Sequence, residues 1–107
     1  MKINDWNIEA MTGYKPITTF YTDFSIADNY GEEAVIDTYE RCMEAWKTDY
    51  KYLTEFVMAL NWKIWEHYYD GNETLAKIYD SLWRKADEYA SENLKGEELS
   101  YYFSTTD

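Results

Sequence analysis

The side chain best suited to acid–base or metal chemistry is His67, the only histidine of the chain. It lies in the segment LNWKIWEHYYD, residues 60–70, together with two tryptophans and two tyrosines. A catalytic or metal-binding histidine needs a partner that orients it, or further ligands at suitable spacing. Three residues before His67, where di-iron helical bundles carry a glutamate, the sequence has Ile64. We therefore interpret His67 as a structural or interfacial residue, and leave open a carboxylate partner from a distant segment.

Other reactive side chains give no complete site. Asp37, Glu40 and Glu44 share one face of a predicted helix, which is half of a carboxylate metal site but is more often a solvated face. Cys42 lies among apolar residues and is predicted to be a small core residue rather than a nucleophile. The sequence signatures of hydrolases, kinases, P-loops and dinucleotide-binding folds do not occur. We predict no catalytic residue, no metal and no cofactor; the alternative is an enzyme or metal protein that combines His67 with carboxylates from other helices.

The elements that position these residues are predicted to be helices, because apolar residues recur three or four positions apart. The pattern predicts helices over residues 19–30, 32–47, 48–69 and 73–94, with one further short turn within 97–103. Gly31 and Asp70-Gly-Asn separate them, and Asn72 is a predicted N-cap. The chain is thus predicted to be a single all-α domain, a bundle of about four main helices over residues 19–103 with an irregular N-terminal arm over residues 1–18.

The helix predicted over residues 48–69 carries two apolar stripes. The first consists of Leu53, Phe56, Val57, Leu60, Ile64 and Tyr68, and the second consists of Met58, Trp62, Trp65 and Tyr69. Lys63 and Glu66 fall on the remaining, polar side. A helix that is apolar over so much of its circumference is expected to be covered on two sides, as the central helix of the bundle.

Charge excludes several classes of partner. The 107 residues carry a net charge of −11, from twenty-one acidic and ten basic residues, which disfavours direct binding to nucleic acid or to anionic membranes. The acidity is uneven: residues 32–49 carry −4 and residues 87–107 carry −5, whereas residues 50–86 are balanced. The longest wholly apolar run, residues 56–60, is far shorter than a membrane span, and a lone cysteine fits a reducing compartment. We expect a cytoplasmic protein.

Aromatic residues make up 20% of the chain, more than a core of this size requires, so some rings are expected at a surface or interface. The rings predicted to lie outside the core are Trp6, Tyr14, Tyr101, Tyr102 and Phe103. Rings and acids coincide in the predicted interaction surface, which comprises Asp37, Glu40, Glu44, Glu97, Glu98, Tyr101, Tyr102 and Phe103. The acidity has two explanations, solubility or recognition of a basic partner.

Three segments resemble a group of small acidic proteins of Firmicutes, many encoded on conjugative elements or prophages. They are DYKYLTE at residues 49–55, LNWKIW at residues 60–65 and NLKGEELSY at residues 93–101. The resemblance extends from about Met11 to the end of the chain. It implies a bacterial accessory protein and brings no catalytic residue.

These observations predict a non-catalytic protein that binds another protein, as an accessory factor of a mobile element. The alternatives are an acidic mimic of DNA that inhibits a nucleic-acid-binding enzyme, and the metal protein or enzyme described above. A homodimer closed by the surplus rings is also open.

Overall fold

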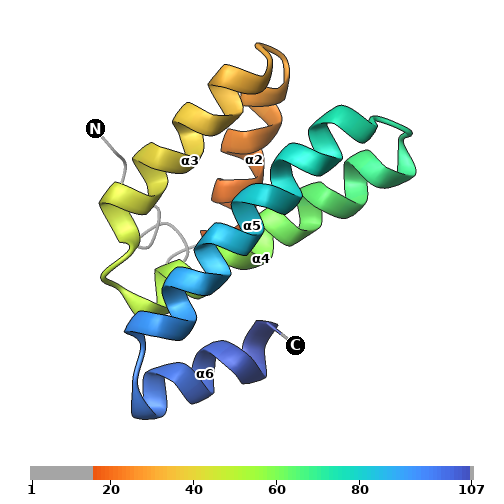
Figure 1. Ribbon diagram of the computed structural model, residues 1–107. Coiled ribbons are helices and arrows are strands. Elements are labelled where there is room, and N and C mark those ends of the chain that lie inside the picture. Colours follow the sequence, from red (N-terminus) through yellow and green to blue (C-terminus); the bar gives the residue numbers. More distant parts are fainter. Residues whose placement is uncertain (1–15, 107) are drawn as a thin grey trace.

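The computed structural model describes residues 16–106, and every regular element among them is an α-helix. There are five such helices, one more than the four main helices predicted (Figure 1). They are α2 (Pro16–Asp28), α3 (Glu32–Trp46), α4 (Tyr50–Tyr69), α5 (Glu73–Asn93) and α6 (Gly96–Thr106). The all-α prediction is confirmed for this part of the chain. The predicted arm was too long, because α2 already begins at Pro16; residues 1–15 lie outside the described residues.

Short polar side chains and one glycine set where the helices begin. The Asp49 carboxylate accepts hydrogen bonds from the backbone N–H groups of Lys51 and Tyr52, at 3.1 and 3.2 Å, so α4 starts at Tyr50. Asn72 caps α5 as predicted, by accepting a hydrogen bond from the Leu75 N–H at 3.1 Å. Gly31 precedes α3 with φ 104°, a backbone conformation in which a Cβ atom would be strained.

Helix α4 is the central element, because it packs against each of the other four described helices. Figure 1 shows α4 and α5 side by side as a helical hairpin, with α2 and α3 on one side and α6 on the other. The prediction of a central helix is therefore confirmed. Among residues 16–106, none of the helices is at once long and apolar enough to cross a membrane.

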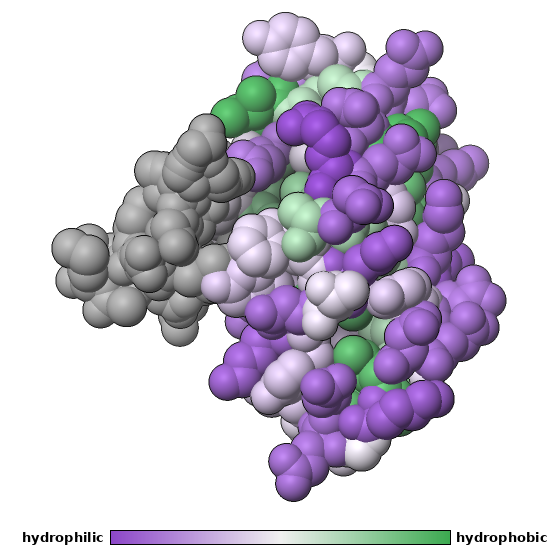
Figure 2. Space-filling model, turned by 90° about the vertical axis from the view of Figure 1, so that its left-hand side faces the viewer, coloured by the Kyte–Doolittle hydropathy of each residue, from purple (hydrophilic) through white to green (hydrophobic). Residues whose placement is uncertain are grey.

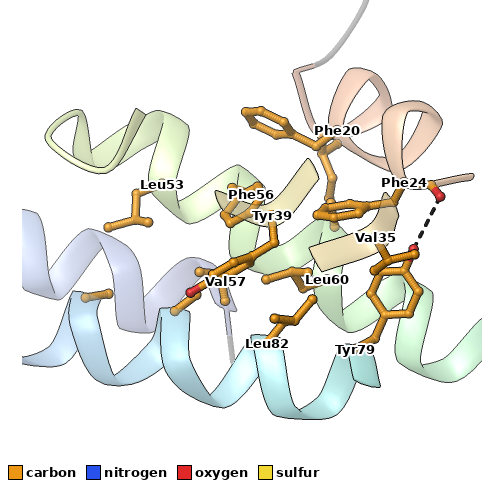
Figure 3. Packing of buried hydrophobic residues seen from close by; sticks show 14 of the residues in the cluster. Phe20, Phe24, Val35, Tyr39, Leu53, Phe56, Val57, Leu60, Tyr79 and Leu82 are labelled. Atoms are coloured by element: carbon orange, nitrogen blue, oxygen red, sulfur yellow. Dashed lines mark hydrogen bonds between the residues drawn. The ribbon is translucent and has the colours of Figure 1, made fainter. Parts of the chain in front are cut away.

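Aromatic rings from three helices meet in the core at Phe56 of α4 (Figure 3). Its ring centroid lies 5.3 Å from that of Phe20, 5.7 Å from that of Phe24 and 5.6 Å from that of Tyr39. Leu60 and Val57, both fully buried, continue the same side of α4. This ring cluster packs α2 and α3 onto the first apolar stripe of α4, and truncating such a ring to alanine typically costs about 3–5 kcal/mol.

The C-terminal helix α6 is longer than predicted, at 11 residues instead of one turn. Tyr102 links this helix to α5, since its ring is fully buried and its hydroxyl donates a hydrogen bond to Asp87 Oδ1 of α5 at 2.5 Å. A helix this short is marginal on its own and is sustained by packing. Because this contact is made in space rather than along the chain, periodicity does not reveal it.

The prediction that neighbouring helices bury the second apolar stripe of α4 is wrong. The first stripe is buried at Leu53, Phe56, Val57 and Leu60. In the second stripe, by contrast, 45% of Trp62, 50% of Trp65 and 79% of Tyr69 are exposed. Tyr68, assigned to the first stripe, is 63% exposed as well.

Candidate functional site

A buried ionic cluster joins α2, α4 and α5. Lys63 of α4, predicted to lie on a polar side, is instead fully buried. Its ammonium donates to Asp28 Oδ2 at 2.8 Å, to Glu66 Oε2 at 3.0 Å and to Ser25 Oγ at 3.0 Å. An ammonium has three donors, so all of them are satisfied. The Lys63 cluster, as we call it, comprises Tyr21, Ser25, Asp28, Lys63, Glu66, His67 and Tyr79.

His67 has the distant carboxylate partner that the sequence left open. Its Nε2 atom lies 2.8 Å from Asp28 Oδ2, 39 residues earlier in the chain. The imidazole stacks on the ring of Tyr79, with centroids 5.5 Å apart, and only 6% of the residue is exposed. Asp28, the last residue of α2, thus contacts both Lys63 and His67 of α4, which lie one helical turn apart.

The remaining hydrogen bonds close the network. The Tyr79 hydroxyl donates to Asp28 Oδ1 at 2.5 Å, and the Tyr21 hydroxyl donates to Glu66 Oε1. Burial, together with the hydrogen bond to Asp28, raises the pKa of Tyr79 far above its usual value. Burial alone would raise the pKa of Glu66, but hydrogen bonds from Tyr21 and Lys63 outweigh it and lower that pKa. The cluster therefore favours a protonated phenol and an ionised Glu66 carboxylate, a charge distribution that holds three helices together.

Asp28, Glu66 and His67 are also the only group of potential metal ligands that converges within residues 16–106, with one donor atom from each inside 4.8 Å. However, the Lys63 ammonium is within hydrogen-bond distance of both carboxylates. A divalent cation at this point would have to replace a buried cation whose donors are all paired. The donor set therefore does not fit a metal ion while Lys63 is charged.

The predicted acidic residues of α3 are exposed. Asp37, Glu40 and Glu44 lie on one side of this helix, and Glu33 extends the row by one turn. Arg41, the only basic residue within α3, forms an ion pair with Asp37 at 2.9 Å. Figure 2 looks at the side of the molecule on which α3 lies, and hydrophilic residues cover most of its coloured surface. The four carboxylates form what we call the acidic row.

A groove of about 440 Å³ runs between α2 and α3. Its lining combines the apolar residues Phe20, Ile26, Ala27, Ala34, Cys42 and Trp46 with Asp23, Asp37 and Arg41. Asp37 belongs to both the groove and the acidic row. Ile26 and Tyr30, which also line it, are 55% and 79% exposed.

The predicted C-terminal candidates divide in two. Glu97 and Glu98 are exposed in the first turn of α6, and Phe103 is 44% exposed. Tyr101 is half-buried, with its ring 5.3 Å from that of Tyr50. The assignment of Tyr102 to an interaction surface is wrong, because this residue is fully buried in the contact that docks α6. Trp6 and Tyr14 lie outside the described residues.

Four large rings on α4 form a patch that sequence reasoning placed in the interior. The rings of Trp65, Tyr68 and Tyr69 contact one another, with centroids 5.8 to 5.9 Å apart, and Trp62 lies one turn earlier. Trp62 also borders a hollow of about 230 Å³ between α4, α5 and α6, lined by Val57, Met58, Asn61, Trp62, Trp83, Thr105 and Thr106. We call Trp62, Trp65, Tyr68 and Tyr69 the aromatic patch. Helical periodicity correctly aligned three of them, but it cannot tell whether a neighbouring helix covers a stripe.

Comparisons of the chain with protein-family models, with curated proteins and with solved structures find no match.

Proposed function

We propose that the protein is a non-catalytic accessory factor that binds a basic protein partner through the acidic row of α3. The observation that carries the proposal is the row itself, four exposed carboxylates on one side of a helix whose only basic residue already pairs with Asp37. Asp37 pairs with Arg41 and Glu44 lies 4.0 Å from Lys47, so four carboxylates face two basic side chains and the row keeps a net negative charge. A surface with such an excess of one sign attracts partners of the opposite sign and speeds their encounter.

Apolar side chains beside the row supply the anchors that a charged rim needs. Ile26 and Tyr30 are exposed next to Asp37, at the groove between α2 and α3. Aromatic and aliphatic anchors contribute most of the affinity of protein interfaces, whereas rim charges chiefly select the partner. The occupant we propose is therefore a basic segment that also carries apolar side chains.

The setting we propose is the bacterial cytoplasm, as part of a mobile element. Its support is the resemblance of residues 49–55, 60–65 and 93–101 to proteins of such elements, and the presence of a single cysteine among the 107 residues, which suits a reducing compartment.

Two triple variants with the same change in net charge test the proposal. Glu33, Glu40 and Glu44 are replaced by glutamine in one, and Glu73, Glu88 and Glu92 of α5 in the other. All six are exposed, and each triple includes one glutamate from the first turn of its helix. We expect the α3 variant to capture basic proteins from a bacterial lysate about tenfold less well than the wild type, and the α5 variant to capture them normally.

Salt provides the second readout, since exposed charges more than about 8 Å apart are screened at physiological ionic strength. Capture through the acidic row should weaken as salt is raised. Equal loss of capture in both triple variants would mean that net charge in general, and not the acidic row, attracts the partner. No loss of capture in either variant would mean that α3 does not contact the partner.

The same row favours a second candidate function, mimicry of DNA. Its carboxylates follow one another every three or four residues, about 4.5–6 Å along the helix axis, and so present a regular line of negative charge. A mimic would compete with duplex DNA for the captured partner, whereas an ordinary binding protein would leave the partner's DNA binding unchanged. A DNA-binding assay on that partner separates the two.

A further inference from the structure

We propose that the aromatic patch of α4 is the interface of a homodimer, in which Trp65 of each copy enters the hollow beside Trp62 of the other. This interface is separate from the acidic row, so the inference goes beyond the proposed function.

Exposure is the first argument. The four rings of the aromatic patch are 45% to 79% exposed, although the core closes without them. Isolated apolar residues on a surface need no explanation, but the rings of Trp65, Tyr68 and Tyr69 contact one another, and Trp62 lies one helical turn before Trp65. Exposed rings gathered in this way usually mark an interface. Tryptophan and tyrosine are also the residues most enriched at the energetic centre of protein interfaces.

Shape is the second argument. The patch provides both a projecting ring and a place to receive one. Trp65 is half exposed and lies one turn beyond Trp62, which borders the hollow of about 230 Å³. An isologous interface pairs the same surface of two copies about a two-fold axis. With that axis between Trp62 and Trp65, Trp65 of each copy faces the hollow of the other.

Charge decides the identity of the occupant. Residues 50–86, which include α4 and most of α5, carry five acidic and five basic residues, whereas the net charge of −11 resides mainly in residues 32–49 and 87–107. A basic partner therefore gains little on this face. The acidic C-terminal segment reaches the hollow only through Thr105 and Thr106, and none of the residues that line the hollow is charged. A second copy therefore meets uncharged side chains at the contact, and the repulsion between the acidic segments acts over distance, where salt screens it.

Sedimentation or light scattering of the full chain at several concentrations tests the inference. We expect a monomer–dimer equilibrium that shifts toward dimer when ionic strength rises from about 0.1 M to 1 M, since the Debye length falls from about 10 Å to about 3 Å. This direction is opposite to that expected for a basic partner on the acidic row, so the two proposals fail independently.

Trp65→Ala should raise the dimer dissociation constant at least about tenfold, as expected for a central interface tryptophan. Tyr30→Ala, which removes an exposed ring outside the patch, should leave it unchanged. Asn61→Asp adds a charge at the edge of the hollow of each copy and should weaken the dimer, increasingly so at low salt.

Three results would overturn the proposal. The first is a monomer up to about 1 mM at high salt. The second is a dimer that Trp65→Ala and Asn61→Asp leave intact. The third is a monomeric protein in which Trp65→Ala abolishes capture of a different protein, which assigns the patch to that protein.

Discussion

Two sides of α4 have exchanged their expected environments. Lys63 is fully buried, whereas Trp65, two residues later, is half exposed. The sequence of α4 alone favours the reverse, because burying an ammonium costs far more than burying an indole unless the charge is paired. The difference lies in the neighbours: α2 brings Ser25 and Asp28 over Lys63, whereas the surrounding residues leave half of Trp65 exposed. Partners from elsewhere in the chain therefore decide which side of this helix is interior.

The largest effect is expected where that pairing is broken. Asp28→Ala removes a carboxylate that accepts from Lys63, His67 and Tyr79, and leaves a buried ammonium with one carboxylate fewer. We expect it to lower the free energy of unfolding by about 3–5 kcal/mol, measured by urea denaturation. That loss is large beside the about 5–15 kcal/mol total stability of small domains.

Asp37→Ala is the matched control, since it removes the carboxylate of an exposed ion pair with Arg41. It should change stability by no more than about 0.5–1 kcal/mol. If both substitutions have the same small effect on the free energy of unfolding, Asp28 does not stabilise the buried Lys63 ammonium. The pairing would then not explain why Lys63 is buried while Trp65 is half exposed.

A double-mutant cycle sharpens the comparison. Lys63→Met replaces the buried ammonium with an apolar chain of similar length, so that Asp28 need no longer balance this charge. The double variant Asp28→Ala/Lys63→Met should be more stable than the sum of the two single losses predicts, by about 0.5–3 kcal/mol. Strict additivity in urea denaturation would mean that the two residues stabilise the fold independently, despite their 2.8 Å contact.

Where sequence reasoning succeeded, the information was local. The breaks between α2 and α3 and between α4 and α5 follow from Gly31 and from Asp70-Gly-Asn, and the ends of α3 and α5 were placed within one residue. The Lys63 cluster could not be predicted in this way, because Asp28 and His67 are 39 residues apart and meet only after α2 packs on α4. The one available signal was that Lys63 and His67 lie one helical turn apart near the buried stripe, a pair of side chains that a carboxylate from another helix can join.

The C-terminal helix α6, whose length the sequence pattern underestimated, depends on a contact that a single substitution can remove. Tyr102→Phe keeps the buried ring of α6 and removes only its hydrogen bond to Asp87. The expected loss is about 0.5–1.5 kcal/mol, with faster hydrogen exchange confined to α6. Tyr30→Phe, at an exposed phenol, should have no measurable effect on stability. If exchange speeds up along α4 instead, Tyr102 supports the whole hairpin rather than the docking of α6.

Lowering the pH should reduce the stability of the fold by protonating Glu66 in the Lys63 cluster. Because its pKa is lower in the folded protein than its usual value near 4.5, an ionised Glu66 adds stability at neutral pH. That contribution is complete above the unfolded pKa and is lost as pH falls through the lower folded value. The Glu66→Gln variant should therefore lose less stability than the wild type between neutral pH and the acid side of this window. Glu88→Gln, which removes one exposed carboxylate on α5, controls for net charge.

The smallest effect is expected on the exposed side of α4. Trp65→Ala removes the largest kind of side chain, yet half of that residue faces solvent and its ring contacts are with Tyr68 and Tyr69, which are themselves exposed. Measured at concentrations low enough for a monomer, the change in unfolding free energy should stay within about 0.5 kcal/mol. A loss of several kcal/mol under those conditions would mean that Trp65 belongs to the core of one chain. The same loss appearing only as concentration rises would show that stability at Trp65 comes from a second copy, since association with the folded state adds to apparent stability by mass action.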